Sequence, residues 1–289
     1  MGTPEPSQAC AAPWPPYRTA TGLARSCHPG PVVAVTATTG ALGVSAGLDA
    51  FRCTLLVAAV LTGQLSVGWC NDAFDARRDA AAGRSGKPVA DGSVGRRAVW
   101  TAAFTAALLC VPLSLACGPA AGAVHLTAVA AAWAYDLGVK ATVLSWLPYV
   151  IGFGSLPAVA ALTLPGSPWP AWWVVAAGAL LGLGAHLGDV LPDIDDDLRA
   201  GVNGLPQRLG ATATALLLPL PLVAASAFLS LAPPGPPGIW GTTTLAAAAP
   251  TALAGLLLTR HHRKAPLAAA AAVAAADVAL LLVRGVAPV

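Results

Sequence analysis

Long apolar runs, separated by short turns that contain Pro and Gly, recur along the 289 residues of this sequence. The hydrocarbon core of a bilayer is about 30 Å thick, so a helix needs roughly 17–25 apolar residues to cross it. Runs of this length predict an all-α, polytopic membrane protein. We predict nine transmembrane helices, at residues 31–48, 53–70, 98–116, 119–137, 142–164, 171–188, 211–231, 240–259 and 265–284.

Charged residues are scarce, and their positions predict the orientation of the chain. Only 10% of the residues are charged, compared with about 25% in a typical soluble domain. The net charge is +3 with no basic cluster, so we expect no nucleic-acid partner. With a cytoplasmic N-terminus, nine helices place 14 of the 16 Lys and Arg residues on the cytoplasmic side, as the positive-inside rule requires. We therefore expect a multi-pass protein of the cell membrane with its C-terminus on the opposite side.

The N-terminal segment differs in composition from the rest of the chain. It holds five prolines and no apolar stretch after a basic start, so it lacks the pattern of a signal peptide. We predict that residues 1–25 form a disordered cytoplasmic tail and that residues 26–289 form one transmembrane domain. The six cysteines show no metal-binding spacing, and we interpret them as small core residues.

Two acidic segments, each following a predicted helix, share one pattern. When residues 71–88 are shifted by 118 positions, their acidic, Gly and Pro residues fall on those of residues 189–206. The aligned pairs are Asn71 with Asp189, Asp75 with Asp193, Asp79 with Asp197, Gly83 with Gly201, Gly86 with Gly204 and Pro88 with Pro206. Such a repeat predicts two duplicated halves, about 26–140 and 141–289, facing each other around a central cavity.

The spacing of the acidic residues indicates metal binding. Residues at i, i+4 and i+8 lie on one face of a helix, so each segment presents a row of oxygen ligands. Like charges in such a row repel each other beside a membrane unless cations bind between them. Hard oxygen ligands suit Mg²⁺, whose coordination a substrate phosphate commonly completes. We therefore predict Mg²⁺ as the cofactor, with the metal ligands Asn71, Asp72, Asp75, Asp79, Asp189, Asp193 and Asp197.

Two facing metal sites would hold a diphosphate from both sides. Metal ions there stabilise the negative charge that grows on the diphosphate as its C–O bond breaks. Basic side chains of the same loop would neutralise the remaining phosphate oxygens; they are Arg77, Arg78, Arg84 and Lys87. For Arg77 and Arg78, the positive-inside rule is an alternative reason for a basic residue. Asp195 and Asp196 lie off the aligned face, and we interpret them as solvated loop residues.

These motifs resemble the signatures of the UbiA superfamily of intramembrane prenyltransferases. The first signature, N-D-x-x-D-x-x-x-D followed by a basic turn, is matched by Asn71, Asp72, Asp75, Asp79, Arg84, Lys87 and Pro88. The second signature is matched by Asp193, Asp197, Gly201, Leu205, Pro206 and Gly210. A smaller match follows the fourth predicted helix, at Tyr135 and Lys140.

The resemblance implies a fold, a reaction and a set of roles. It implies nine helices around a cavity, a diphosphate at the cytoplasmic mouth and a prenyl chain among the helices. Family members ionise a prenyl diphosphate to an allylic cation that an acceptor attacks, so we expect prenyl transfer to a small, aromatic acceptor. The expected catalytic residues are Asp72, Asp75, Asp193, Tyr135 and Lys140, and the residues expected to bind the metal-bound diphosphate are Asn71, Arg77, Arg78, Arg84 and Lys87.

Two other functions are compatible with the same acidic rows. In a terpene cyclase, the allylic cation would be quenched within its own chain, with no acceptor. In a cation or phosphate transporter, the acidic rows would form a gate, although transporters usually place their coupling site near the bilayer midplane. The aspartates lie instead at the ends of predicted helices, which favours an enzyme.

Several polar residues beside the motifs have alternative interpretations. Lys140 either contacts the diphosphate or extends to the membrane boundary, and Asp136 either orients Lys140 or faces water. His28 stands where many family members have Arg-Pro-His, which bears on how an acceptor is held. We expect His186 to hydrogen-bond with a neighbouring helix. Asp277 lies inside the last predicted helix, so we expect it either to have a partner or to mark a water path.

Overall fold

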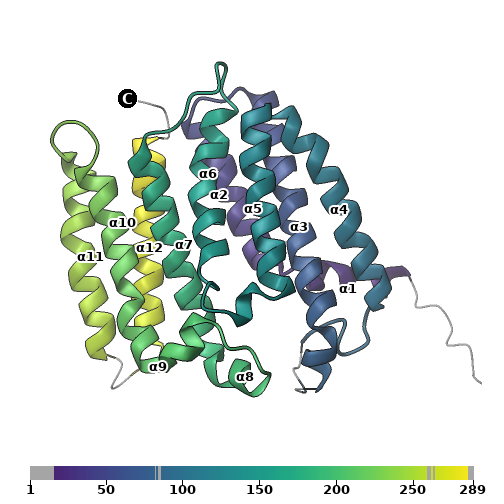
Figure 1. The fold of residues 1–289 in the computed structure, drawn as a ribbon. Coiled ribbons are helices and arrows are strands. Elements are labelled where there is room, and N and C mark those ends of the chain that lie inside the picture. The colour runs from purple at the N-terminus through teal and green to yellow at the C-terminus, as the bar shows by residue number, and fades with distance from the viewer. Residues whose placement is uncertain (1–15, 82, 84–85, 259–261, 263, 286–289) are drawn as a thin grey trace, which may run out of the picture.

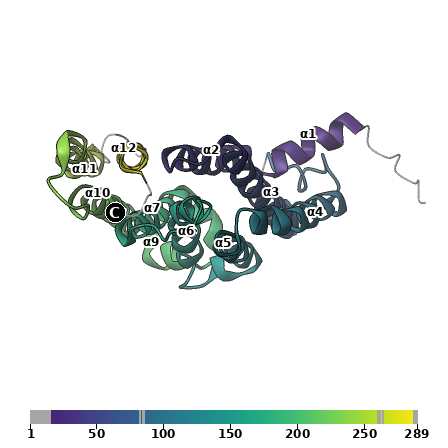
Figure 2. The same cartoon turned by 90° about the horizontal axis from the view of Figure 1, so that it is seen from above.

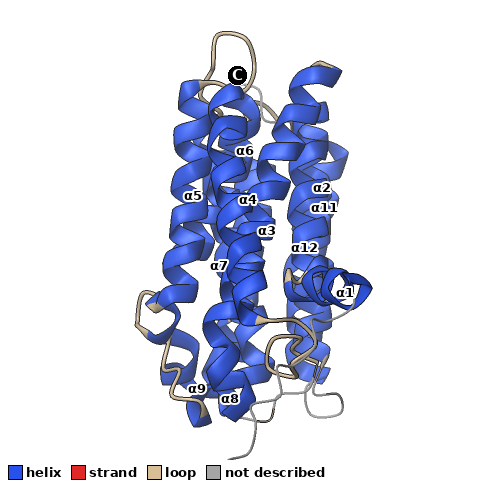
Figure 3. Ribbon diagram, turned by 90° about the vertical axis from the view of Figure 1, so that its right-hand side faces the viewer, coloured by secondary structure: helices blue, strands red, loops and turns tan. Residues whose placement is uncertain are grey.

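The computed structural model describes residues 16–81, 83, 86–258, 262 and 264–285, and these residues form helices joined by turns and loops, without a strand (Figure 3). This confirms the predicted all-α class. The helices of the N-terminal part are α1 (Pro16–Ser26), α2 (Pro29–Ser45), α3 (Ala50–Ala81), α4 (Arg96–Ala116), α5 (Pro119–Leu137) and the short 3₁₀ helix η1 (Val139–Ala141). Those of the C-terminal part are α6 (Leu147–Leu162), α7 (Trp172–Val190), the 3₁₀ helix η2 (Leu191–Asp193), α8 (Ile194–Arg199), α9 (Leu205–Leu217), α10 (Pro219–Leu231), α11 (Gly238–Leu258) and α12 (Ala265–Arg284).

Each range predicted to span the membrane contains a helix, but the helices differ in length. Five helical segments among the described residues are long and apolar enough to cross a membrane: Ala50–Ala81, Arg96–Ala116, Trp172–Arg199, Gly238–Leu258 and Ala265–Arg284. The pair α9 and α10 makes a sixth if it counts as one bent span, and α6 is apolar but shorter. With 16 residues, α6 lies below the roughly 17–25 residues that a straight span needs. The chain is thus a multi-pass helical protein, and the count of nine spans stays a prediction.

The predicted span 211–231 is divided in the structure. Helices α9 and α10 meet at an angle of 46°, and α10 begins with Pro219, which Pro221 follows. Proline has no backbone N–H to donate to the preceding turn, and its ring clashes with that turn. A helix therefore kinks where proline occurs. Gly210, with a φ of 80°, adds a second irregularity inside α9. As a result α9 lies at one end of the bundle, beside α8 (Figure 1).

The long helices run side by side along a common direction (Figure 1), and seen from above they form a curved arrangement with α2 and α12 on one side (Figure 2). The C-terminal end of α3 lies at the same end of this bundle as α8 and α9 (Figure 1). The C-terminal end of α12 lies at the opposite end. The two acidic motifs are therefore carried to one end, as predicted.

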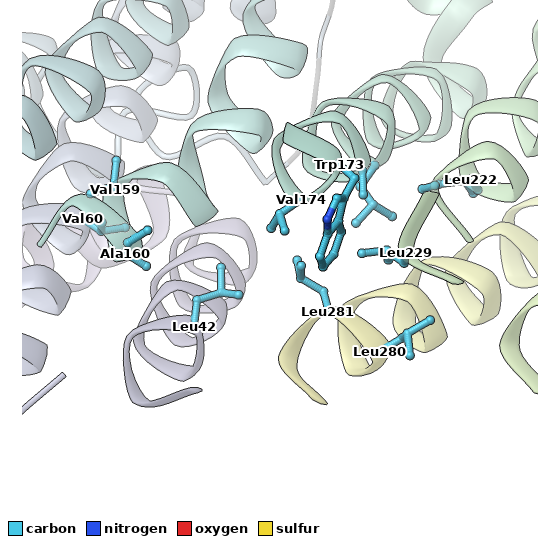
Figure 4. Close-up of a cluster of buried hydrophobic side chains, with 14 of the residues drawn as sticks. Leu42, Val60, Val159, Ala160, Trp173, Val174, Leu222, Leu229, Leu280 and Leu281 are labelled. Atoms are coloured by element: carbon cyan, nitrogen blue, oxygen red, sulfur yellow. The ribbon is translucent and has the colours of Figure 1, made fainter. Parts of the chain in front are cut away.

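Buried aliphatic side chains hold the two parts of the bundle together (Figure 4). Trp173 and Val174 of α7 lie near Leu229 of α10 and Leu281 of α12 in Figure 4. Glycine allows α6 and α7 to approach each other closely, because a Cβ on Gly182 would lie 2.3 Å from the carbonyl oxygen of Tyr149. Small residues at helix contacts are the usual means of packing helices in lipid. This contact fixes Tyr149 against α7.

The N-terminal segment corrects one prediction in part. We predicted a disordered tail over residues 1–25, yet residues from Pro16 onward form α1, which runs across the axis of the bundle (Figure 1); residues 1–15 lie outside the described residues. The indole Nε1 of Trp69 donates to the carbonyl oxygen of Leu23 at 2.9 Å. A β-carbon added to Gly22 would lie only 2.7 Å from Cβ of Val94, so α1 packs tightly against the segment that precedes α4. Such tertiary contacts have no signal in a polar, proline-rich stretch of sequence.

Candidate active site

The first acidic motif occupies the last turns of α3 and faces into the protein. Asp72, Asp75 and Asp79 are 1%, 6% and 1% exposed, whereas Arg77 on the other side of the helix is exposed. The segment is continuous α-helix, so Asn71, Asp75 and Asp79 share one face as the spacing predicts. Burying three carboxylates in this way costs several kcal/mol per ion unless each is paired and hydrogen-bonded. The site therefore depends on nearby cations.

Within the described ranges, three basic side chains supply positive charge to this row. Nζ of Lys140, from η1, lies 2.5 Å from Oδ2 of Asp75, and Nη2 of Arg78 lies 2.6 Å from the same oxygen. Nζ of Lys87 lies 3.4 Å from Oδ1 of Asp72 and 4.0 Å from Oδ2 of Asp79. Lys140 is buried at 7% exposure, so it does not extend to the membrane boundary. Of its two predicted positions, the structure has the one inside the acidic site.

Several carboxylate oxygens of the same cluster have no hydrogen-bond partner among the described residues. Oδ2 of Asp72, Oδ1 of Asp75 and Oδ2 of Asp136 are buried without a hydrogen bond. A buried acceptor without a donor costs about 1–3 kcal/mol, and more when it is charged. Buried carboxylate oxygens without a hydrogen bond, on two neighbouring aspartates, are suitable ligands for a hard divalent cation such as Mg²⁺.

Asp136 does not have the water-facing position considered from the sequence. It is only 3% exposed, so it does not face water, and its Oδ1 accepts a hydrogen bond from Nδ2 of Asn71 at 2.8 Å. This bond fixes the amide of Asn71 at the start of the acidic row. Asp136 therefore orients Asn71 through a direct hydrogen bond.

The second acidic motif is built differently, which corrects the prediction of a continuous helical row. Asp189 is the last residue but one of α7, Asp193 ends the 3₁₀ helix η2, and Asp197 lies in α8. A 3₁₀ turn has 3.0 residues instead of 3.6, so it rotates the residues that follow away from a common α-helical face. Pro192, which lacks a backbone N–H, lies in this turn. Asp189 and Asp193 are exposed and Asp197 is half-buried, unlike the buried first row.

Partners that the sequence did not reveal hold the second motif. The hydroxyl of Tyr149 donates to Oδ2 of Asp189 at 2.6 Å, and Nε2 of Gln207 donates to Oδ2 of Asp197 at 2.9 Å. Tyr149 lies inside a predicted apolar helix, and Gln207 directly follows the Leu-Pro of the second signature. No pattern in the sequence brings either one to an aspartate, because the pairs are formed by packing of α6 on α7 and of α9 on α8.

An aromatic and polar cluster lies beside the second motif. The ring of Tyr135 packs edge-on against those of Tyr149 and His186, with centroid distances of 5.3 and 6.1 Å. Nε2 of His186 lies 3.1 Å from Oγ of Ser145, which also accepts the backbone N–H of Leu205 at 3.0 Å. His186 thus bonds to Ser145, which lies in the turn between η1 and α6 and not in a neighbouring helix as predicted. This network ties the loop that carries Lys140 to the chain after the second motif.

His28 shows that the two motifs surround one region. Burial lowers the pKa of its imidazole, Lys87 lowers it further, and the carboxylates of Asp72, Asp189 and Asp79 oppose the shift. Nε2 of His28 lies 3.4 Å from Nζ of Lys87. Carboxylates of both motifs therefore act on a single side chain. Its φ of 58° places it in the left-handed region at the start of α2.

One predicted residue, Arg77, does not join the site. Arg77 is exposed, and Arg84 lies outside the described residues. Among the residues that the structure describes, no group of three or more His, Cys, Asp or Glu side chains converges as a metal cage. A metal ion here would take a few carboxylate oxygens and complete its coordination with water and phosphate, as Mg²⁺ commonly does.

Comparison with known proteins agrees with this architecture. The model of the UbiA prenyltransferase family matches residues 32–281. A UbiA homolog from Archaeoglobus fulgidus, solved bound to GPP and Mg²⁺, superposes with a TM-score of 0.68 at 14% identity, covering 90% of this chain and 97% of that one. The apo structure of a UbiA homolog from Aeropyrum pernix K1 gives a TM-score of 0.69 at 19% identity, with coverages of 88% and 98%.

A third solved structure, a digeranylgeranylglyceryl phosphate synthase, gives a TM-score of 0.68 at 16% identity, covering 92% of this chain and 96% of that one. At these identities the structural likeness shows the fold. No curated protein matches the chain by sequence. The family model spans most of the residues, however, so the chain belongs to the UbiA prenyltransferase family, which confirms the predicted family and the predicted enzyme class.

Proposed function

We propose that this protein transfers a prenyl group from a prenyl diphosphate to a small, aromatic acceptor within the membrane, with Mg²⁺ as its cofactor. The observation that supports the proposal is the buried first motif, whose Asp72 and Asp75 each keep one oxygen without a hydrogen-bond partner in the part of the chain that the structure describes. Solved relatives with the same fold were obtained with GPP and Mg²⁺ or with DMAPP and Mg²⁺. Oxygens of this kind, beside lysines, suit a metal-bound diphosphate.

Each motif has a proposed share of the metal sites. Asn71, Asp72, Asp75 and Asp79 would hold one Mg²⁺, and Asp189, Asp193 and Asp197 would hold another. Bound Mg²⁺ would stabilise the charge that develops on the diphosphate when its C–O bond breaks. The hydrogen bonds that Asn71 donates to Asp136 and that Tyr149 donates to Asp189 orient two of these ligands, and such outer partners commonly set metal affinity.

The remaining site residues act on the substrate in this proposal. Lys87, Lys140 and Arg78 contact phosphate oxygens, because their charged groups already lie against the carboxylates of the first motif. We assign Arg77 and Arg84 to the same role, since both belong to the chain around this motif. The face of the Tyr135 ring stabilises the allylic cation by a cation–π interaction. The acceptor then forms the new bond and releases one proton.

We also propose the membrane arrangement. Residues 26–289 form one domain of nine spans in two pseudo-repeated halves, with the motifs and the N-terminus at the cytoplasmic side of the cell membrane. Both motifs lie at one end of the bundle and the end of α12 at the other (Figure 1), and the positive-inside rule orients that end toward the cytoplasm. Cysteine labelling of exposed positions in intact cells, at Asp49 and at Asp195, tests this: only the Asp49 variant should react with a reagent that cannot cross the membrane.

The experiment that tests the reaction uses purified protein and radiolabelled prenyl diphosphates. We expect label in a hydrophobic product only when both Mg²⁺ and an aromatic acceptor are present. A labelled product without an acceptor would support a terpene cyclase instead. Uptake of substrate into proteoliposomes without any chemical change would support a transporter. If no diphosphate is released with any combination of prenyl length and acceptor, the proposed function is wrong.

A further inference from the structure

The cations of the first motif occupy the oxygens that a metal ion would need. Oδ2 of Asp75 is contacted by both Lys140 and Arg78, and Oδ1 of Asp72 is contacted by Lys87. The opposite oxygen of each of these two aspartates is buried without a partner. Each aspartate thus has one oxygen paired with a basic side chain and one available oxygen. A bridging or bidentate metal site would require the paired oxygens as well.

Among the residues that the structure describes, the opposite charges of the cluster nearly balance. Four buried carboxylates, those of Asp72, Asp75, Asp79 and Asp136, lie among three basic side chains, Lys87, Lys140 and Arg78. A divalent cation that enters alone meets three positive groups, whose repulsion is strong where water is excluded. A diphosphate offers these groups new negative partners. Charge alone therefore favours entry of the metal and the diphosphate together.

The main chain of Lys140 is held in place while its side chain can turn. A Cβ on Gly204 would lie 2.5 Å from the carbonyl oxygen of Lys140, so the chain after the second motif packs directly on η1. The Leu205 N–H bond to Ser145 holds the same loop from its other end. The four-carbon stem of a lysine can still swing its ammonium group between neighbouring anions. Lys140 is therefore anchored beside one motif and paired with the other.

We infer that Lys140 and Lys87 are exchangeable counter-ions, which neutralise Asp75 and Asp72 when the site is empty and pass to the diphosphate when it binds, so that Mg²⁺ and diphosphate bind cooperatively. The inference rests on the proposed function and adds an order of events to it. Mg²⁺ alone binds weakly because it competes with the lysines for Asp75 and Asp72. Coupling of this kind is reciprocal, so the metal raises diphosphate affinity by the same factor.

Calorimetric titration of the full chain in detergent tests this with MgCl₂ and inorganic pyrophosphate as probes. We expect pyrophosphate to bind at least about tenfold more tightly with excess Mg²⁺ than without it. In Lys140→Met, Mg²⁺ alone should bind about tenfold more tightly, because Asp75 loses one of its two basic partners and keeps only Arg78. Pyrophosphate with Mg²⁺ should bind more weakly to the same variant. Lys87→Met should likewise strengthen the binding of Mg²⁺ alone and weaken the binding of pyrophosphate with Mg²⁺. This variant tests the inference if Lys140→Met does not fold.

Two variants serve as controls for these affinities. Lys140→Arg keeps the charge and should keep the wild-type pattern. Lys264→Met removes an exposed lysine that follows α11 and should change neither affinity. If removal of Lys140 or Lys87 leaves the affinity for Mg²⁺ alone unchanged or lower, the exchange does not occur, although the proposed function stands. If wild-type protein binds no pyrophosphate even with Mg²⁺, the proposed function itself fails.

Discussion

Nζ of Lys140 lies 2.5 Å from Oδ2 of Asp75, although the two residues are 65 positions apart in the sequence. The contact joins the loop after α5 to the last turns of α3. The same loop is hydrogen-bonded to the start of α9 through Ser145. One short segment thus connects the two acidic motifs, and substitutions in it should affect both.

Asp75→Asn should lower prenyl transfer by about 100-fold or more, because it removes a negative ligand where charge stabilisation matters most. Turnover of a radiolabelled prenyl diphosphate measures the loss. Asp49→Asn is the control, since Asp49 is exposed at the opposite end of the bundle and pairs with Arg52. If Asp75→Asn retains wild-type turnover, Asp75 does not bind the metal.

Tyr149→Phe should weaken Mg²⁺-dependent diphosphate binding by about tenfold, because a hydrogen bond to a charged acceptor contributes about 1.5–3 kcal/mol. Calorimetry with Mg²⁺ and pyrophosphate measures this. A double-mutant cycle with Asp189→Asn provides the control, since the two changes should be clearly less than additive if the 2.6 Å contact is what matters. Additive effects would mean that Tyr149 acts elsewhere.

Gly204→Ala should destabilise the protein by about 1–3 kcal/mol, the usual cost of overpacking. The added Cβ would lie 2.5 Å from the carbonyl oxygen of Lys140 and 2.9 Å from Oγ of Ser145. Thermal unfolding in detergent measures this loss of stability. The prenyl transfer activity of Gly204→Ala should also fall. Gly152→Ala, where a Cβ meets nothing within 4 Å, should be neutral or stabilising. Equal behaviour of the two variants would contradict the close packing on η1.

Ser226→Ala should destabilise the C-terminal half by about 1–3 kcal/mol, because it leaves a buried carboxyl group with no hydrogen bond. The hydroxyl of Ser226 donates to Oδ1 of Asp277 at 2.6 Å, and Asp277 is fully buried. Ser155→Ala, whose hydroxyl bonds only to its own helix, is the control in the same thermal unfolding assay. Adding Asp277→Ala to Ser226→Ala should recover part of the stability; a further loss would mean that Asp277 has another essential partner.

His28 should make the protein less stable in acid. Its pKa is lowered by burial and by Lys87, so the unfolded chain binds the proton more readily. The contribution of neutral His28 to the free energy of unfolding is fully present above about pH 6.5, the pKa of histidine in the unfolded chain. It is lost as the pH falls through the lower pKa that His28 has in the folded protein. In His28→Asn, which tolerates the left-handed backbone, unfolding temperature should fall less between pH 7 and pH 5. If the unfolding temperatures of wild type and variant change equally with pH, His28 does not cause the loss of stability in acid.

The long helices and the first motif could be predicted from the sequence because each depends on local pattern. Apolar length marks the spans, and the spacing of Asn71, Asp75 and Asp79 defines a helical face. The same reasoning was wrong for the second motif. Pro192 has no counterpart in the first motif, where Phe74 stands at the aligned position, and a proline changes the helical geometry of a row that looks equivalent by alignment.

Other features of the site depend on contacts between distant segments. Tyr149, Ser145 and Gln207 reach the second motif only through packing of separate helices. Asp136 could be noticed as an acidic residue at a helix end, but its bond to Asn71 could not be predicted. Likewise the partner of Asp277 was expected from the cost of a buried carboxyl group, and only the structure identifies it as Ser226.

Helix α3 is 32 residues long, which corresponds to about 48 Å at 1.5 Å per residue, and this exceeds a hydrocarbon thickness of about 30 Å. Its final turns can therefore stand among the lipid headgroups while the rest of the helix remains among acyl chains. Ions arriving from the aqueous phase and an oily chain sliding along the leaflet would meet at that boundary. The ions would not have to enter the hydrocarbon, and the oily chain would not have to enter water.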